Sequence, residues 1–447
     1  MAAEIAAAGG RCLLIEQGGA HGARDRHAPE EILSGVGGAG LFSDGKHSFY
    51  PSASELWRLP DAARLDHAYE ATRRVLERHG VPAPPFPRAL GNGPPADASC
   101  GDPWQLKRYP SLYASLDERM RCIAELYEQS GELPWLSARV VSAKRTSLIA
   151  LEVEQNGVRR TVETERIVVA TGRLSPRWIR SWLEPLGVTF AFRRLEVGVR
   201  IETGAAASLF SALEGVDPKL SFDGGRARLL TFCTCRDGEV VVGIAGGIHS
   251  VSGRADGPRT GRSSIGLLAR ITDVALARAI EPHVFGAGAS FQAPLGELLR
   301  AAEDADPRLV ASFGPAGAAV VADALGRFVE RFQDLRNDRA AVVHGPFIEG
   351  VGDIPSPATT SSSRRACSSQ ETCAVASAAS SRAWSVVATW GDGSRRRSCD
   401  ERLGLRAELC ERTIVGDHLV PQARVVELRL GLVVVDGRQV GPSRGGS

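Results

Sequence analysis

The sequence predicts an α/β fold for this chain of 447 residues. Three observations point to it. A short helical segment leads into an apolar strand at the N-terminus, three strand patterns follow one another between residues 137 and 163, and alternating strands share residues 190–345 with longer helical segments. The length favours about two domains. The apolar content of 43% is ordinary for a globular protein.

The first predicted element is a helix followed by a strand. Residues 2–8 are rich in alanine, which favours a helix, and the two glycines after them are expected to end it. Residues 11–16 have the pattern of a short buried strand that ends in an acid. Helix, glycine turn, apolar strand and terminal acid form the second half of a βαβ dinucleotide-binding unit. The first strand and its glycine loop would then lie before Met1.

Glu16 is the first candidate site residue. A carboxylate at the end of the second strand of such a unit accepts hydrogen bonds from the ribose of a nucleotide. The alternative is a solvated glutamate at a strand end. The helix, turn and strand that precede Glu16 favour the ribose-binding role.

The second candidate is a glycine-rich loop over residues 34–46, Ser-Gly-Val-Gly-Gly-Ala-Gly-Leu-Phe-Ser-Asp-Gly-Lys. Its glycines allow close approach to a ligand and positive φ, and consecutive backbone amides can hold a pyrophosphate or the edge of a flavin. Ser43 is expected to donate a hydrogen bond and Lys46 to add positive charge. The alternative, a merely flexible loop, explains the Phe-Ser-Asp-Gly-Lys run less well. The expected cofactor contacts are Gly37, Gly38, Gly40, Ser43, Asp44 and Lys46.

Helices and strands alternate through the next part of the chain. Helical patterns are predicted over 62–79 and 111–130, with a proline-rich stretch at 81–104 between them. The three strands between residues 137 and 163 predict a β-meander. Residues 167–172 predict a separate buried strand that runs into a turn.

That turn holds the third candidate, Ala170-Thr171-Gly172. A buried strand that ends in Ala-Thr-Gly after a β-meander is typical of flavoproteins with two dinucleotide-binding domains, in which the chain returns to the cofactor at this point. Thr171 and Gly172 are therefore expected cofactor contacts. The alternative is an ordinary junction between a strand and a turn.

From about residue 190 the pattern changes to that of an α+β domain. Residues 195–201 and 239–243 alternate like strands of an antiparallel sheet. Helical segments are predicted at 265–281 and 318–335.

The expected organisation has four parts. After residue 357 the chain is rich in Ser, Arg, Ala and Thr without an apolar period, which predicts an irregular, disordered tail. The parts are a cofactor-binding domain over 1–190, an inserted substrate domain over 191–345, a return to the first domain over 346–357, and an aberrant tail over 358–447.

Two further motifs carry weaker signals. Cys233 and Cys235 are two apart on a predicted strand and share a face, so they offer a redox pair or soft metal ligands. No second cysteine pair or histidine cluster lies at zinc spacing, so buried structural cysteines are preferred and no metal is expected. His249 lies in a glycine-rich segment that would face a substrate, although a lone histidine is more often structural. No catalytic acid or base is assigned.

Composition argues against several classes. A net charge of +2 gives no reason to expect nucleic acid or an anionic membrane as partner. No apolar run reaches the length of a membrane span, and no signal peptide opens the chain. Nine scattered cysteines then favour a reducing, cytoplasmic location over a disulfide framework. A nucleophile elbow, a Walker loop and a His-Glu-x-x-His helix are all absent from the sequence, which argues against hydrolases and NTPases.

Taken together, these segments resemble a family of bacterial FAD-dependent dehydrogenases whose substrate is unidentified. The resemblance covers roughly residues 1–357. It implies a Rossmann-like FAD-binding domain, split in sequence by an inserted α+β domain. It also implies FAD as cofactor, a small-molecule substrate, and NAD(P)H or another electron partner. The matching segments, in the family's order, are residues 34–46, Ala170-Thr-Gly172, Leu195-Glu-Val-Gly-Val-Arg200, Phe232-Cys-Thr-Cys235 and Gly350-Val-Gly-Asp353.

Two family motifs are absent: the opening Gly-x-Gly-x-x-Gly loop and a closing Gly-Asp-x-Cys-Gly-x-Phe-Arg-Gly. With suitable synonymous codons, residues 365–379 read one nucleotide earlier contain the closing motif. A shift of reading frame between about residues 353 and 365 is therefore expected, and sequencing the gene tests it. Two alternatives to a working dehydrogenase stay open: a non-catalytic apo-protein that cannot hold FAD, and a flavin monooxygenase or isoprenoid-reductase-like enzyme.

Overall fold

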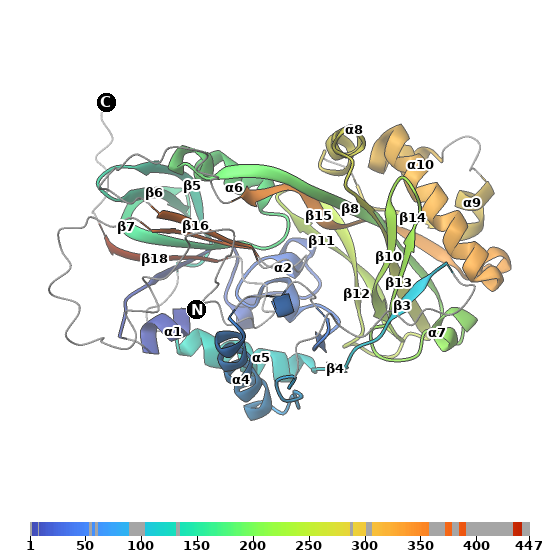
Figure 1. Cartoon of the computed structure of the whole chain (residues 1–447), viewed down its shortest axis with the longest axis horizontal. Coiled ribbons are helices and arrows are strands. Elements are labelled where there is room, and N and C mark those ends of the chain that lie inside the picture. The colour runs from blue at the N-terminus through green and yellow to red at the C-terminus, as the bar shows by residue number, and fades with distance from the viewer. Residues whose placement is uncertain are drawn as a thin grey trace.

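The protein has a mixed α/β fold with several antiparallel sheets, which confirms the predicted mixture of helices and strands. Two large sheets lie towards opposite ends of the molecule, and helices α2 (Pro29–Leu33), α4 (Ala62–Arg78) and α5 (Leu116–Glu128) lie between them (Figure 1). The computed structural model describes residues 2–7, 9–52, 56–58, 61–88, 103–130, 135–286, 289–300, 306–356, 372–377, 384–389 and 432–439.

The first sheet has the order β1-β18-β7-β17-β16, and β6 and β5 extend it from β7. The predicted meander is confirmed as β5, β6 and β7. The separate strand expected at 167–172 is instead the end of β7, because β18 pairs with that strand on both sides of an irregularity between Thr164 and Arg166. The strands are β1 (Leu13–Glu16), β5 (Ala138–Arg145), β6 (Ile149–Gln155), β7 (Val158–Ala170), β16 (Thr372–Ser377), β17 (Trp384–Thr389) and β18 (Leu432–Gln439).

Strands β1 and β7 run in the same direction on either side of β18. Leu432 pairs with Glu16 on one side and with Ala170 on the other, and both pairings are antiparallel. The carboxyl ends of β1 and β7 therefore reach the same edge of the sheet. Adjacent strands lie about 4.8 Å apart, so the backbones of Glu16 and Ala170 are separated by roughly 10 Å. Helix α1 (Ala2–Ala7) precedes β1, as predicted.

Most of the tail that was expected to be irregular, residues 358–447, lies outside the described residues, and the three segments of it that the structure describes are strands. Strands β16, β17 and β18 all lie in this segment and pair within the first sheet. The run Leu432-Val-Val-Val435 has the β-branched composition that favours strands, but the polar composition around it obscured the signal. Most of residues 365–379, where the frame shift was inferred, lie outside the described residues.

The second sheet has the order β14-β15-β8-β13-β10-β9-β3. Its two longest strands, β8 and β15, pair from Glu202 and Val342 to Thr189 and Ser356 and run from this sheet towards the first one (Figure 1). The strands are β3 (Gln105–Lys107), β8 (Thr189–Gly204), β9 (Lys219–Asp223), β10 (Arg228–Cys235), β13 (Arg262–Ile271), β14 (Phe291–Pro294) and β15 (Val342–Ser356).

The helix predicted over 265–281 is wrong in its first part. Residues 265–271 belong to β13, and α8 (Val274–Val284) begins only after Asp273, whose side chain accepts a hydrogen bond from the backbone of Leu276. A short apolar run fits a buried strand as well as a helix, so periodicity alone could not separate the two.

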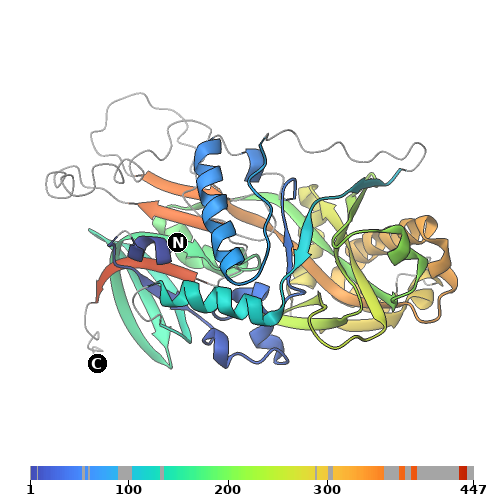
Figure 2. The ribbon, with the colours of Figure 1, turned by 90° about the horizontal axis from the view of Figure 1, so that it is seen from below.

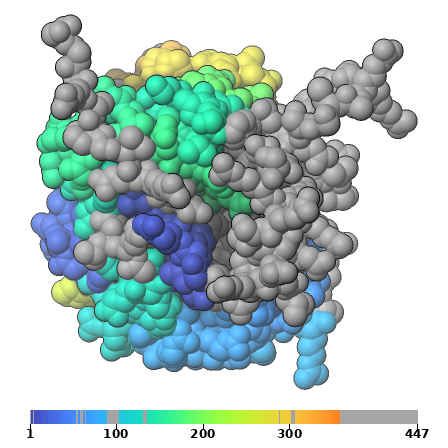
Figure 3. Space-filling view, turned by 90° about the vertical axis from the view of Figure 1, so that its left-hand side faces the viewer, coloured from blue at the N-terminus to red at the C-terminus, as the bar shows by residue number. Residues whose placement is uncertain are grey.

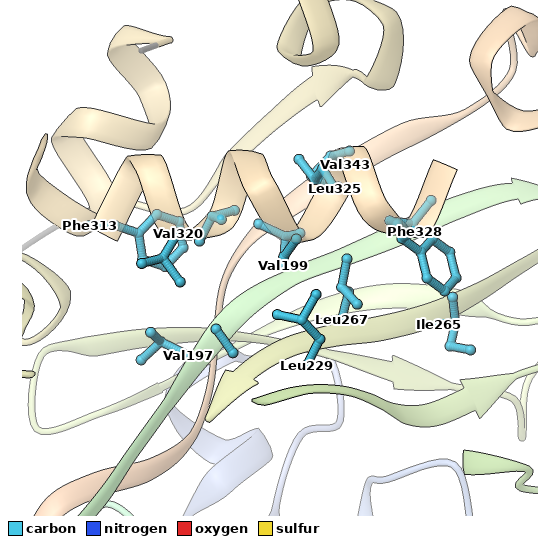
Figure 4. Close-up of a cluster of buried hydrophobic side chains, with 14 of the residues drawn as sticks. Val197, Val199, Leu229, Ile265, Leu267, Phe313, Val320, Leu325, Phe328 and Val343 are labelled. Carbon is cyan, nitrogen blue, oxygen red and sulfur yellow. The ribbon is translucent and has the colours of Figure 1, made fainter. Parts of the chain in front are cut away.

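Helix α10 (Pro307–Arg331) covers one face of the second sheet and builds the largest core. Figure 4 shows Phe313, Val320, Leu325 and Phe328 of this helix above Val197, Val199, Leu229, Ile265 and Leu267 of the strands. The helix bends at Gly314, whose φ of 69° is not helical. It contains most of the helix predicted over 318–335. Among the described residues it is the one helix long and apolar enough to cross a membrane, but much of it is buried against this sheet.

Helices α4 and α5 cross on the underside of the molecule (Figure 2). Helix α5 begins at a capping box, in which Ser115 and Glu118 satisfy each other's backbone N–H groups. Residues 111–113 of the helix predicted over 111–130 form a strand instead. At the end of the molecule seen in Figure 3, the N-terminal residues (dark blue) lie between the meander and these two helices.

The remaining elements are short. They are α3 (Gly38–Leu41), α6 (Pro176–Leu183), α7 (Ser208–Ala212), α9 (Leu295–Arg300), β2 (Lys46–Ser48), β4 (Ser111–Tyr113), β11 (Glu239–Ala245) and β12 (Ile248–Arg254), with 3-10 turns at His21–Ala23, Leu56–Arg58, Glu184–Leu186 and Gln333–Asn337.

Candidate functional site

Glu16 is fully buried at the end of β1. Its Oε1 accepts hydrogen bonds from the backbone N–H groups of Gly18 (2.8 Å) and Gly35 (3.1 Å). Its Oε2 is buried and has no hydrogen-bond partner among the described residues. Burial raises the pKa of Glu16 to about 7, although these hydrogen bonds oppose the shift. A buried oxygen without a donor is costly, so this atom is suited to a donor that the described residues do not supply.

Thr171 lies at the same edge of the sheet, one residue after the end of β7. Its Oγ1 is also buried without a partner in the described structure. Gly172, with a φ of 84°, has no atom within 4 Å of the position where a Cβ would stand, so the backbone here borders open space. The structure thus brings Glu16, Thr171 and Gly172 together at one edge, which we call the strand-end edge.

Gly37 and Gly38 lie in a turn that a buried arginine stabilises, and the sequence did not reveal this arginine. Both adopt positive φ, 91° and 54°, a conformation that glycine accepts most readily. Arg24 is buried beside them and donates from Nη1 to the carbonyls of Val36 (2.8 Å) and Gly38 (3.0 Å). Burial lowers the pKa of Arg24 to about 10, so it remains charged at neutral pH. This guanidinium organises the glycine turn that leads into α3.

The rest of the predicted loop lines a cavity of about 50 Å³, which has room for a few water molecules. Glu16, Thr171 and Gly172 are not among its lining residues. Chain continuity nevertheless joins the two places, because Arg173 lines the cavity and directly follows Gly172. The predicted residues that line the cavity are Gly40, Ser43, Asp44 and Lys46.

Two of these predicted donors are already used inside the protein. The hydroxyl of Ser43 donates to the carbonyl of Gly40 (2.9 Å). Lys46 donates to Asp44 Oδ2 (2.9 Å), Asp217 Oδ1 (3.2 Å) and the carbonyl of Thr234. Burial alone would lower the pKa of Lys46, but the charge of Asp44, with smaller effects from Cys233 and Asp217, holds it well above its usual value. Lys46 thus balances two buried carboxylates, and its three donors are occupied.

The thiol of Cys233 donates a hydrogen bond to Asp44 Oδ2 (2.7 Å) and lines the cavity. Burial alone would raise the pKa of Asp44, but Lys46 and this thiol keep it below its usual value. Burial and the charge of Asp44 raise the pKa of Cys233. At neutral pH the pair is therefore a carboxylate and a protonated thiol. Cys235 is fully buried, as predicted for a structural cysteine.

The backbone of Cys233 is held in an unusual conformation. Its φ is 52° at an irregularity in the pairing of β10 with β13. Arg200, which is fully buried, donates from Nη2 to the carbonyl of Cys233 (2.6 Å) and from Nε to Ser264 Oγ (2.8 Å). At Gly253 a Cβ would stand 2.1 Å from Nη2 of Arg200, so a glycine is needed there. Such strain concentrates at functional sites. In the sequence, the Phe-Cys-Thr-Cys motif was the one signal that pointed to this place.

Sequence reasoning missed a second ion pair in the cavity, between Arg173 and Glu349. Both side chains are buried, with 7% and 2% exposed, and Nη1 of Arg173 donates to Oε1 of Glu349. The Oε2 atom of Glu349 is buried without a partner in the described part of the chain. His249, by contrast, lies on β12 and does not line the cavity.

No protein-family model matches the chain, and no curated protein is significantly similar to it. Among the described residues, no group of three His, Cys, Asp or Glu side chains is placed to hold a metal ion. Function must therefore be argued from the geometry of the strand-end edge and of the cavity.

Proposed function

We propose that the protein is an FAD-dependent oxidoreductase that transfers hydride or electrons to or from a small-molecule substrate. The observation that carries the proposal is the pair of unpartnered oxygens at the strand-end edge, Glu16 Oε2 and Thr171 Oγ1. Ligands of open α/β sheets bind outside the carboxyl ends of parallel strands. The hydroxyls of a nucleotide ribose are donors of the kind that Glu16 Oε2 lacks.

The residues present fit the adenosine end of FAD. Glu16 would hold the ribose, Thr171 would bond a neighbouring polar atom, and the open space beside Gly172 would admit the ligand. Arg173, the residue after Gly172, lines the cavity, so the two places are neighbours along the chain. When bound, the flavin supplies the redox chemistry, and the protein supplies binding and orientation.

A second candidate is a non-catalytic protein that does not hold FAD. Strand β18, which lies between β1 and β7, begins at the strand-end edge and runs away from it. It is therefore not followed there by a helix. In doubly wound folds the pyrophosphate binds at the helix N-terminus that follows the strand in this position. This arrangement favours weak or absent flavin binding.

The visible absorbance spectrum of the purified chain tests the proposal. Flavin bands that stay with the protein and release FAD on denaturation would support an oxidoreductase. Glu16→Gln should lower FAD retention, whereas Glu165→Gln, on an exposed residue of β7, should leave it unchanged. A folded but colourless protein that takes up no added FAD would instead favour the non-catalytic candidate.

A further inference from the structure

Glu349 has one carboxylate oxygen more than its surroundings satisfy. Arg173 donates to Oε1, and the described residues supply no donor to the buried Oε2. Glu349 lines the cavity, and its side chain is 2% exposed. Leaving such an oxygen unpaired is unfavourable, most of all for a charged group. A ligand that donates a hydrogen bond here would remove that cost.

The cations beside the cavity are already balanced. Lys46 pairs with Asp44, Arg119 with Asp256, and Arg173 with Glu349. Among them, the Nε of Arg119 has no partner in the described structure, so it offers one contact to an acceptor. The rest of the lining includes five apolar side chains, Leu41, Val75, Leu76, Phe232 and Phe347.

We infer that this cavity binds a small molecule with an apolar body and a hydroxyl or protonated amine that donates to Oε2 of Glu349. The protonated thiol of Cys233 lies on the same lining and reports on occupancy. Arg119 would meet a second, acceptor atom of the ligand. A purely anionic ligand satisfies Arg119 but leaves Glu349 without its donor.

The role of the bound molecule as a substrate rests on the proposed function. The binding of an amine or alcohol in the cavity does not depend on it. In an oxidoreductase the carbon that bears the hydroxyl or ammonium would lose a hydride to the flavin. The same group would lose one proton to Oε2 of Glu349. The products are then a carbonyl or an iminium, reduced flavin and a protonated Glu349, so that atoms and charge balance. Glu349 would thus orient the substrate and accept its proton.

The test uses three probes of matched size, isobutylamine, isobutanol and isobutyrate, on the full-length, flavin-free chain. Each is tested for protection of Cys233 against alkylation by iodoacetamide, with peptide mass spectrometry as the readout. The amine and the alcohol should slow the modification of Cys233, and the acid should not. Because no flavin is present, a failure to bind FAD and a failure of this inference are separate results.

The matched variants are Glu349→Gln, which keeps an oxygen for Arg173, and Glu165→Gln as an exposed control. Glu349→Gln should weaken protection by the amine roughly tenfold, since a hydrogen bond to a charged group is worth about 1.5–3 kcal/mol. The inference would be overturned if isobutyrate protected Cys233 as well as isobutanol does. It would also be overturned if none of the three probes protected Cys233. If Glu349→Gln does not fold, the order in which the three probes protect Cys233 in the unsubstituted protein still tests the inference.

Discussion

The thiol of Cys233 and the carboxylate of Asp44 form a hydrogen bond of 2.7 Å between Sγ and Oδ2. The two residues are 189 positions apart, so this contact joins the glycine segment to the second sheet. Lys46 forms a salt bridge with the carboxylate of Asp44, and Arg200 donates a hydrogen bond to the backbone carbonyl of Cys233. The thiol is thereby fixed on the lining of the cavity.

Asp44→Asn should make Cys233 more reactive. The charge of Asp44 helps to raise the pKa of the thiol, so its removal, with Lys46 still present, should increase the thiolate fraction. The rate of alkylation at Cys233 should rise at every pH below the wild-type pKa, as measured by mass spectrometry. Asp117→Asn, on an exposed residue of α5, is the control and should change nothing. An unchanged rate in Asp44→Asn would show that burial alone governs the thiol.

Glu16 should make the folded state less stable as the pH rises from 4.5 to 7. Its pKa is about 7 when folded against an ordinary value of 4.5, so between these values the folded state binds more protons than the unfolded state. The free energy of unfolding should then fall over this interval by up to about 3 kcal/mol from this group. Glu16→Gln should remove this part of the slope in urea unfolding, and Glu165→Gln should retain it. Equal slopes in all three proteins would contradict the burial of an uncompensated carboxyl.

Thr171→Val should weaken FAD binding, because it replaces the unpartnered hydroxyl with a methyl group of similar size. Loss of one hydrogen bond of about 0.5–1.5 kcal/mol predicts a dissociation constant that is several-fold higher. Thr171→Ser keeps the hydroxyl and should bind as the parent chain does. Fluorescence titration of the purified proteins with FAD measures both. Equal binding by the valine variant would remove Thr171 from the site.

Gly45→Ala should destabilise the fold by roughly 2–4 kcal/mol. The residue has a φ of 74°, and a Cβ would stand 2.1 Å from Nη1 of Arg119 and 2.3 Å from the carbonyl of Ala114. At Gly22, by comparison, a Cβ meets nothing within 4 Å, so Gly22→Ala should change stability by no more than about 0.5 kcal/mol. Urea unfolding of the two variants compares them directly. Similar stabilities of the two variants would mean that Arg119 and Ala114 move aside for the added methyl group at little cost.

Truncation after Ser356 should expose the centre of the first sheet. Strand β18 supplies hydrogen-bonding partners to both β1 and β7, so its removal leaves residues 13–16 and 167–170 without them on that side. Hydrogen exchange should accelerate in these two segments and stay slow in residues 265–271 of the second sheet. If residues 358–447 were disordered, truncation would not change hydrogen exchange in β1 and β7. Unchanged protection there would therefore support the expectation of a disordered tail.

Part of the candidate site could be predicted from the sequence because it depends on local chemistry. Glu16 ends an apolar strand, Thr171 follows another, and the glycines at 37 and 38 mark positive φ. Other buried charged residues of the site could not be predicted in this way. Glu349 pairs with Arg173, 176 residues away, and Arg200 donates to the carbonyl of Cys233, 33 residues away. Arg24 lies only 14 residues before Gly38, but nothing near it in the sequence signals a buried charge.

The sequence by itself determined the mixture of helices and strands, the meander and the approximate positions of the longer helices, because periodicity and glycine placement act within a few residues. Only the tertiary structure decided that residues 265–271 are strand, since burial on both faces removes the period that distinguishes strand from helix. It alone placed β18 between β1 and β7, and gave Lys46 three partners inside the protein. The pairing of strands and the balance of buried charges depend on which distant segments meet, and local sequence does not encode that.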